Sequence, residues 1–218
     1  MKKKCYECKL VNFPDAEVCS RCGGHLGPER AGRVRAGLPS FLRRFAVFLL
    51  VCAVSVAGFY FSLVMSARPL DLAQRKSVES AIGLLESKGF TNEVFLLRRL
   101  AVYRSEDNWL NASVEKENAF AATNFPFEIV TIYPDFFLYP ADDVERAAIL
   151  LHEAKHLEGA DERAAYEFVW RSREKLGWTT ESYRHSEILA QVRRQTRDAV
   201  PSLFVCDINP FGDCTERR

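Results

Sequence analysis

The chain carries no charged residue between Arg44 and Arg68, although charged residues make up 27% of its 218 positions. Phe45 to Met65, inside this gap, is nearly continuous phenylalanine, leucine, valine and alanine. A stretch of about 20 apolar residues spans a bilayer as a helix. A buried core helix of that length would carry polar residues at helical spacing, and the apolar part of a cleaved signal peptide would be shorter. The missing charge therefore predicts a single transmembrane helix over residues 45–67.

A strong net charge, internal repeats and long low-complexity tracts are also absent. The formal net charge of the whole chain is +1, which points to no charged partner. Basic residues mix with glycine and proline in residues 27–44, and this composition predicts a flexible linker near anionic lipid headgroups. The linker has no pattern of interleaved aromatic residues, which disfavours nucleic acid as a partner. Composition therefore predicts the lipid bilayer as a partner.

Positive charge is distributed unevenly about the apolar segment. Ten lysines and arginines precede it, whereas only Arg68, Arg75 and Lys76 follow it closely. The ten are Lys2, Lys3, Lys4, Lys9, Arg21, Arg30, Arg33, Arg35, Arg43 and Arg44. The positive-inside rule then predicts a cytoplasmic N-terminus, with residues 69–218 in the periplasm or outside the cell. The chain is expected to be a single-pass protein of the cytoplasmic (inner) membrane.

Four of the cysteines form two CxxC pairs near the N-terminus, Cys5 with Cys8 and Cys19 with Cys22. Four thiolates at this spacing complete a tetrahedral Zn²⁺ and leave no open position, which is typical of a structural site. A redox role is disfavoured because no βαβ pattern accompanies the pairs. Residues 1–26 resemble the small zinc ribbons at the N-termini of many bacterial membrane proteins. So short a segment is expected to fold only together with its metal.

The remaining cysteines are used differently. Cys206 and Cys214 bracket a turn-rich loop that suits a disulfide, and a disulfide suits an oxidising space outside the cytoplasm. Cys52 stands alone in the apolar segment, where it serves as a small apolar residue. Cysteine usage therefore agrees with the sidedness that the basic residues predict.

The most informative motif of the chain is a His-x-x-x-His pair at residues 152–156. His152 and His156 are four residues apart, so both imidazoles lie on one face of a helix and can reach a single ion. Glu153 is offset from that pair and can hold a metal-bound water, taking its proton as the water attacks a carbonyl. Asp142 and Glu145 read as a capping box at the start of this helix. The motif predicts a catalytic Zn²⁺ with Glu153 as the general base.

A catalytic zinc site needs a third protein ligand and an open position for water. Gly159 lies three residues after His156 and suits a sharp turn, because glycine adopts left-handed backbone angles without a Cβ penalty. Glu162 then arrives where the third ligand is needed, and it is the ligand that we prefer. The alternatives that remain open are Glu158, Asp161, Glu167 and His185.

This spacing resembles the zincin metallopeptidases, and HExxHxxGxx followed by a ligand resembles the metzincin pattern. Two features depart from that pattern. Glu162 stands where metzincins usually have histidine, and a glutamate in this role resembles the gluzincins. The only methionines are Met1 and Met65, so the methionine turn of the metzincins is missing. The resemblance covers about residues 127–167 and implies a zincin-like site without fixing a subfamily.

The resemblance implies roles for two neighbouring features. Residues 127–133 are rich in β-formers and end at Pro134, and in zincins an edge strand before the active-site helix holds the substrate as an added strand. An ordinary core strand is the alternative. Tyr166, four residues after Glu162, is placed to donate to an oxyanion, as tyrosines do in some zincins. A packing role is the alternative for this side chain.

The outer domain over residues 69–218 is large enough for a core of its own. Its order of elements predicts an α+β fold of zincin-like type, with a small sheet, the active-site helix and following helices. Further helices are expected over 70–87, 162–176 and 181–199, a strand is favoured over 93–104, and residues 108–124 read as a loop in which 118–122 approach the strand at 127–133. The zinc ribbon and one transmembrane helix precede this domain.

We therefore expect a membrane-anchored, zinc-dependent metallopeptidase that acts on a peptide or protein substrate. It would carry one catalytic and one structural Zn²⁺. The alternative is a non-catalytic single-pass sensor or scaffold, whose ribbon binds a cytoplasmic protein and whose outer domain binds a ligand. Glu153 favours the enzyme, because a structural histidine site has no need of a base at that position.

Overall fold

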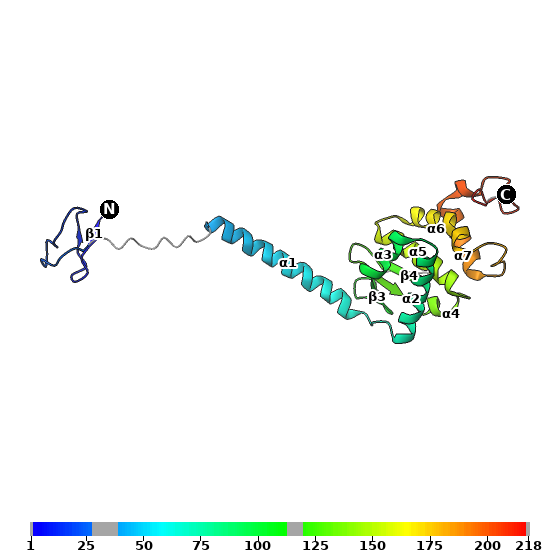
Figure 1. Cartoon of the computed structure of the whole chain (residues 1–218), viewed down its shortest axis with the longest axis horizontal. Coiled ribbons are helices and arrows are strands. Elements are labelled where there is room, and N and C mark those ends of the chain that lie inside the picture. The colour runs from blue at the N-terminus through cyan, green and yellow to red at the C-terminus, as the bar shows by residue number, and fades with distance from the viewer. Residues whose placement is uncertain (1, 28–38, 113–119, 217–218) are drawn as a thin grey trace. The chain divides into compact units, whose positions relative to one another are not determined.

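The computed structural model describes residues 2–27, 39–112 and 120–216. The chain divides into two compact units, Met1–Val51 and Cys52–Arg218, and each is described by itself (Figure 1). Most of the predicted linker over 27–44 lies outside the described residues, as do residues 118 and 119 of the segment expected to approach the strand.

The first unit starts with a small antiparallel sheet of strands β1 (Lys3–Lys4) and β2 (Val11–Asn12). Its interior is made of thiols rather than aromatic rings. Cys5 and Cys19 are each 2% exposed, whereas Tyr6 and Phe13 are 89% and 81% exposed. A unit built in this way buries little apolar surface, and a bound metal would supply the cohesion that the hydrophobic effect does not.

Helix α1 (Ser40–Ser66) contains the apolar segment. It is long and apolar enough to cross a membrane, and it is the single such helix among the described residues. Its length agrees with the helix that the missing charge predicts over 45–67. From Cys52 onward α1 belongs to the second unit, and Leu63 near its end is fully buried there.

The sheet of the second unit has three short strands, β3 (Val102–Arg104), β4 (Ala121–Asn124) and β5 (Ile129–Ile132). Their order is β3-β5-β4, with β5 parallel to β3 and antiparallel to β4. Strand β5 is therefore the central strand of this sheet, and all four of its residues are buried. The edge role expected for residues 127–133 is therefore wrong, and the core alternative is correct. The edge position beside α5 belongs to β4, in a segment that was expected to be a loop.

The helices of the second unit surround α5, most of whose residues are buried. They are α2 (Leu72–Ser87), α3 (Thr91–Arg99), α4 (Asp135–Leu138), α5 (Asp143–Leu157), α6 (Glu162–Leu176), α7 (Glu187–Ala199) and a 3₁₀ turn (Pro201–Phe204). Helix α5 packs against α2, α3, α6 and β4, so the motif helix is the central helix of this unit. The fold is α+β, as predicted.

Two predicted elements need correction. Residues 94–97 form part of helix α3, because their apolar side chains pack Val94 and Leu97 into the core at helical spacing. Helix α7 begins at Glu187 rather than at Glu181, because Ser186 caps it by accepting a hydrogen bond from the Leu189 N–H. By contrast, α6 has the predicted bounds.

The cap of α5 is also simpler than expected. Asp142 accepts hydrogen bonds from the N–H groups of Val144 and Glu145, as a capping residue should. The Glu145 carboxylate does not return to the Asp142 N–H but accepts from the Ala141 N–H at 2.8 Å. It also accepts from Trp178 Nε1 at 3.3 Å, so this 1% exposed glutamate joins α5 to the end of α6.

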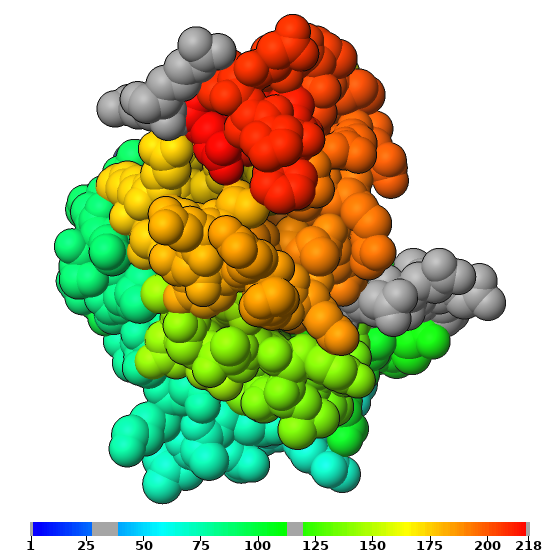
Figure 2. Space-filling model, turned by 90° about the vertical axis from the view of Figure 1, so that its right-hand side faces the viewer, coloured from blue at the N-terminus to red at the C-terminus, as the bar shows by residue number. Residues whose placement is uncertain are grey.

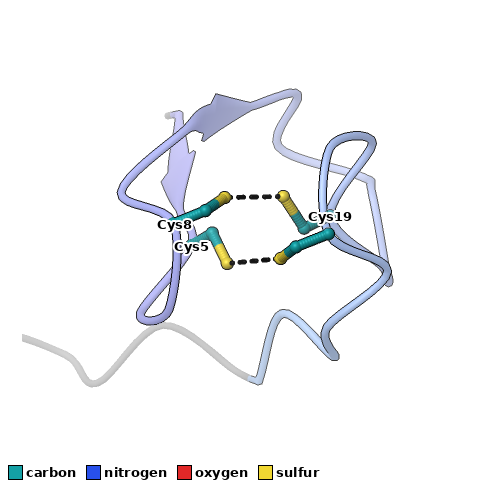
Figure 3. Close-up of side chains that lie close together, drawn as sticks. Cys5, Cys8 and Cys19 are labelled. Carbon is teal, nitrogen blue, oxygen red and sulfur yellow. Dashed lines mark hydrogen bonds between the residues drawn. The ribbon is translucent and has the colours of Figure 1, made fainter.

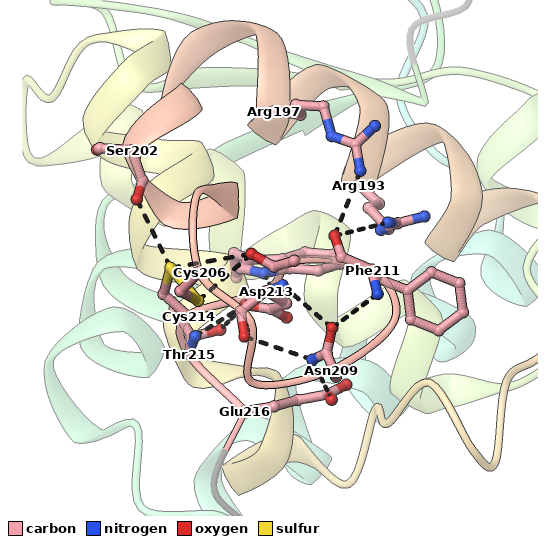
Figure 4. The surroundings of a disulfide bond; sticks show 12 residues. Arg193, Arg197, Ser202, Cys206, Asn209, Phe211, Asp213, Cys214, Thr215 and Glu216 are labelled. Carbon is pink, nitrogen blue, oxygen red and sulfur yellow. Dashed lines mark hydrogen bonds between the residues drawn. A yellow bond between two sulfur atoms is a disulfide. The ribbon is translucent and has the colours of Figure 1, made fainter.

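The C-terminal segment folds over the end of α6 and α7. Cys206 and Cys214 form the predicted disulfide (Figure 4). Asp213, beside it, pairs with Arg173 of α6 at 2.6 Å, and both side chains are nearly inaccessible. The space-filling view shows these red C-terminal residues at the top of one face of the domain, against the amber and orange residues that precede them in the chain (Figure 2). This segment is therefore an integral part of the outer domain.

Candidate metal centres

Three metal-ligating side chains meet where α5 ends and α6 begins. His152 and His156 lie one turn apart on α5, and their Nε2 atoms are 3.0 Å apart. Glu162, the first residue of α6, places Oε2 3.2 Å from Nε2 of His152 and Oε1 3.4 Å from Nε2 of His156. The ligand atoms all lie within 4.8 Å of one another, so the group could hold a metal ion. Glu162 is the carboxylate that the structure brings to both histidines.

A tight turn returns the chain to the histidines. Gly159 has a φ of +83°, a left-handed conformation that glycine adopts readily, and its N–H donates to the carbonyl oxygen of His156 at 2.9 Å. Asp161 then caps α6 by accepting from the Ala164 N–H at 2.8 Å. Helix α6 therefore starts at Glu162, with this side chain one residue beyond the cap.

The hydrogen bonds of His156 suit a metal ligand. Its Nδ1 lies 2.9 Å from the carbonyl oxygen of Ala160. A carbonyl oxygen only accepts, so Nδ1 carries the proton and Nε2 is left to face the cluster. Metal-binding histidines commonly hold their second ring nitrogen in this way, which fixes the tautomer and the ring orientation. The donor set and this orientation together fit a Zn²⁺ ion.

Charge pairing shifts pKa values inside the cluster. The hydrogen bond that His156 donates to the Glu162 carboxylate raises the pKa of His156 to about 9. The hydrogen bonds from His152 and then His156 hold the pKa of the Glu162 carboxyl well below its usual range. A carboxylate that stabilises a proton on His156 would equally stabilise a cation held between these side chains. A metal ion binding here would displace the proton of His156.

Glu153 reaches the same cavity from the buried side of α5. It is 4% exposed, and its Oε2 accepts a hydrogen bond from Oγ1 of Thr123 at 2.8 Å. Thr123 lies on β4, so the edge strand holds the carboxylate in place. Glu153, Thr123 and the three ligands line one cavity of about 440 Å³, which is large enough for part of a peptide.

Tyr166 lies beside the ligands as expected from its position four residues after Glu162. Its ring centroid is 4.5 Å from that of His152, and it lines the same cavity. Burial raises the pKa of its phenol to about 12. The hydroxyl therefore keeps its proton at neutral pH and is able to donate a hydrogen bond.

The other candidate third ligands lie elsewhere. Asp161 is engaged as the cap of α6, and Glu167 pairs with Arg171 at 2.8 Å. Glu158 pairs with Lys155. His185 lines a separate surface hollow formed by the segment that connects α6 to α7 and by the residues before α5. None of these four belongs to the group of ligand atoms found among the described residues.

The sequence did not point to Thr123, because its polar neighbourhood reads as a loop. The available cue was Phe125-Pro126, which marks a turn between two segments able to pair as strands. Thr123 faces Glu153 only because β4 pairs with β5 in this register, with Thr123 opposite Val130.

A second centre lies in the first unit, where all four CxxC thiols converge (Figure 3). Cys5 Sγ lies 3.6 Å from Cys22 Sγ, and Cys8 Sγ lies 3.4 Å from Cys19 Sγ. The four sulfur atoms are within 4.8 Å of one another and could hold a metal ion. Four cysteines at these distances are consistent with a closed Zn²⁺ site.

Backbone and side-chain donors favour a thiolate in this cluster. The N–H groups of Cys22 and Arg21 lower the pKa of Cys19 to about 6. Asn12 adds an Nδ2 donor 3.6 Å from the same sulfur. A thiolate is the form of cysteine that binds metal, so these donors support the site.

Comparisons with known proteins give no relative for either unit. No protein-family model, no curated protein and no solved structure matches the chain. The chemistry of the two centres therefore rests on their own residues.

Proposed function

We propose that the chain is a membrane-anchored, zinc-dependent metallopeptidase of zincin-like type, whose outer domain hydrolyses peptide bonds. One observation carries this proposal: His152, His156 and Glu162 converge on a cavity that also receives the buried carboxylate of Glu153. Three ligands leave a fourth position open, which is typical of a catalytic zinc rather than a structural one.

Each of these residues of the cavity has its own proposed role in hydrolysis. Bound Zn²⁺ supplies Lewis acidity, which polarises a carbonyl and lowers the pKa of water. Glu153 accepts the proton of the attacking water on Oε1, while Thr123 holds Oε2. Glu153 then returns that proton to the leaving amine. Tyr166 donates its phenol O–H to the oxygen on which negative charge develops.

Strand β4 is the element proposed to hold the substrate. It is an edge strand of the described sheet, and Ala121, Ala122 and Thr123 line the cavity. An extended peptide could add to this edge through main-chain hydrogen bonds, which demand no particular side chains. The substrate-binding role that the resemblance implies for residues 127–133 is therefore proposed for β4 instead.

We further propose that α1 crosses the cytoplasmic membrane, with the cysteine cluster inside and the outer domain in the periplasm or outside the cell. The excess of lysine and arginine before α1 supports this direction. The disulfide between Cys206 and Cys214 supports an oxidising space for the outer domain. The first unit, which keeps four thiols close together, suits the reducing cytoplasm.

The test is metal analysis and peptide hydrolysis on the full-length protein in detergent. The native protein should carry two zinc ions per chain and release fragments from an unfolded protein substrate. Glu162→Ala should lower the zinc content to about one and abolish hydrolysis, because a ligand contributes binding energy directly. Glu153→Gln should keep both ions and lose hydrolysis, because the base acts after the metal is in place.

The matched control is Glu167→Gln, which removes another α6 carboxylate that pairs with Arg171 and lies outside the cluster. It should keep both the metal and the activity. Full zinc content without hydrolysis in the native protein would favour the sensor or scaffold alternative. Full zinc content in Glu162→Ala would show that this carboxylate is not a ligand.

A further inference from the structure

The end of helix α1 is packed into the outer domain. Trp109 holds it at two points: its indole Nε1 donates to Ser62 Oγ and its backbone N–H donates to Ser66 Oγ, both at 3.2 Å. The Trp109 ring also meets the Phe59 ring edge-on, with centroids 5.6 Å apart. Leu63, on this face of α1, is fully buried. The last two turns of α1 thus bind the domain along one face.

The opposite face of the same turns remains apolar and exposed. Phe61 is 63% exposed and Met65 is 78% exposed. Phe61 precedes Ser62 and Met65 precedes Ser66 in the chain. Consecutive residues of an α-helix differ in position along the helix axis by only about 1.5 Å. Phe61 therefore lies at the height of Ser62, where Trp109 is bound. If the bilayer covers Phe61 and Met65, it reaches the height of Trp109.

The length of α1 supports that height. The charge-free run over residues 45–67 is about 34 Å long as a helix, and a bilayer's hydrocarbon core is about 30 Å thick. Nearly the whole run is needed to cross it. The first charge after the run is on Arg68, which pairs with Glu106 at 3.3 Å, and both side chains are largely exposed. This pair marks the level of the headgroups.

The side chains around Trp109 are suited to that level. Trp109 is 50% exposed and Leu110 is 37% exposed. Tryptophan is enriched where a bilayer meets water, because its ring is apolar and its N–H is polar. An apolar side chain of this size left half in water would be costly, whereas the interface of the bilayer accommodates it.

One short turn joins this surface to the cavity. Phe127 packs on Phe59 of α1 with ring centroids 5.4 Å apart. Phe125, two residues earlier, lines the cavity, and its ring is 3.5 Å from the point where a Cβ on Gly159 would lie. Two residues span at most about 7 Å of chain. Phe125, a 57% exposed part of the cavity wall, therefore lies close to α1.

We propose that the outer domain lies on the bilayer that α1 crosses, with Trp109, Leu110 and Phe125 in the interfacial layer of the phospholipids. The cavity then opens at the membrane surface and receives polypeptide segments located there. This inference rests on the membrane anchoring proposed above. The occupant of this surface is the phospholipid bilayer, because the surface is continuous with the lipid-facing side of α1.

Tryptophan fluorescence tests the proposal without measuring zinc or hydrolysis. The chain has three tryptophans, and Trp170 and Trp178 are only 1% and 0% exposed. Full-length protein would be placed in phosphatidylcholine vesicles with or without bromine near the headgroup end of the acyl chains, since bromine quenches tryptophan at short range. The native protein should lose emission in brominated vesicles, and Trp109→Phe, which keeps an aromatic ring against Phe59, should lose none.

Two reporters added to the Trp109→Phe protein locate the cavity. Phe125→Trp should restore quenching, because residue 125 is an exposed part of the cavity wall close to α1. Val205→Trp should not, because this 77% exposed residue belongs to the C-terminal segment, on the side of the domain away from α1 (Figure 1). Circular dichroism and flotation with the vesicles would confirm that each variant is folded and inserted.

Each outcome decides the matter. Equal emission of the floated native protein in both vesicles would overturn the bilayer contact, and quenching of Trp109→Phe would assign it to another part of the chain. Quenching at residue 205 as strong as at 125 would overturn the placement of the cavity. A protein that did not float would refute the anchoring and this inference together, and loss of hydrolysis alone would affect neither.

Discussion

Thr123 Oγ1 donates a hydrogen bond to Glu153 Oε2 at 2.8 Å, and this bond joins the edge strand β4 to the motif helix α5. It holds one oxygen of the carboxylate that we propose as the general base. The geometry of this base therefore depends on the register of β4, although Thr123 is not near the histidines in sequence.

Thr123→Val should lower the rate of hydrolysis about tenfold or more, because a hydrogen bond to a charged group is worth about 1.5–3 kcal/mol. Its zinc content should not change, since neither residue is a ligand. Thr123→Ser keeps the hydroxyl and should keep most of the rate. The measurement is steady-state kinetics beside metal analysis. Equal rates for the valine and serine variants would show that the bond does not serve catalysis.

Zinc binding to the outer domain should release a proton at pH 7. The hydrogen bond that His156 donates to Glu162 raises the pKa of His156 to about 9, so the metal-free residue is protonated at pH 7 and must become neutral to bind. Zinc affinity should therefore fall as the pH is lowered from about 9. Calorimetry in two buffers of different ionisation enthalpy measures the release.

The control for this titration is Glu162→Gln, which removes the carboxylate that holds the proton on His156. Its zinc binding should be weaker and should release less proton at pH 7. A heat of binding that did not depend on the buffer in the native protein would contradict the prediction.

The sequence predicted the helical parts of the site better than the strands. The bounds of α6 follow from local signals: Asp161 caps its first turn and Gly177, with a φ of +85°, ends it. The same local logic placed His152, His156 and Glu162 close together. These residues lie within a dozen positions, so one turn decides their geometry.

The strand order, by contrast, depends on contacts between distant segments. The apolar composition of β5 is equally compatible with an edge and with a central position, and only its pairing with both β3 and β4 decides between them. The strand prediction for residues 94–97, which lie in helix α3, is wrong for a related reason: a short apolar run is compatible with a strand and with a helix. Thr123 could not be assigned without the register that places it opposite Val130.

Gly159→Ala should weaken zinc binding about tenfold. A Cβ at this position would meet the Phe125 ring at 3.5 Å, an ordinary contact, so space is not the obstacle. The obstacle is the φ of +83°, because a left-handed conformation costs residues other than glycine about 1–2 kcal/mol. That strain would oppose the turn that returns Glu162 to the histidines, and about 1.4 kcal/mol is a factor of ten in affinity.

The matched control is Gly83→Ala on helix α2. Gly83 has open space around it and lies in a helix, where alanine is more favourable by about 0.5–1 kcal/mol. This variant should melt at a slightly higher temperature and bind zinc like the native protein. Competition with a fluorescent chelator measures both affinities. Native affinity in Gly159→Ala would mean that the turn tolerates an αL alanine and does not limit the site.

Asp213→Ala should strongly destabilise the outer domain. Arg173 and Asp213 are 1% and 2% exposed and lie 2.6 Å apart, and Trp170 Nε1 donates to the same Asp213 oxygen at 3.0 Å. Removing the carboxylate leaves the buried guanidinium with only Glu216 as a counter-charge, at 3.7 Å and partly exposed, and breaking a buried pair typically costs about 3–5 kcal/mol. For a domain of this size that corresponds to a fall in melting temperature of roughly 10 °C.

The double variant Arg173→Met, Asp213→Leu removes both charges and should melt much closer to the native protein, because apolar side chains often replace a buried pair without loss. A double variant as unstable as Asp213→Ala alone would show that the hydrogen bonds of Asp213, rather than its charge, hold the C-terminal segment on α6. Thermal melting followed by circular dichroism, with the disulfide intact in every sample, separates the two explanations.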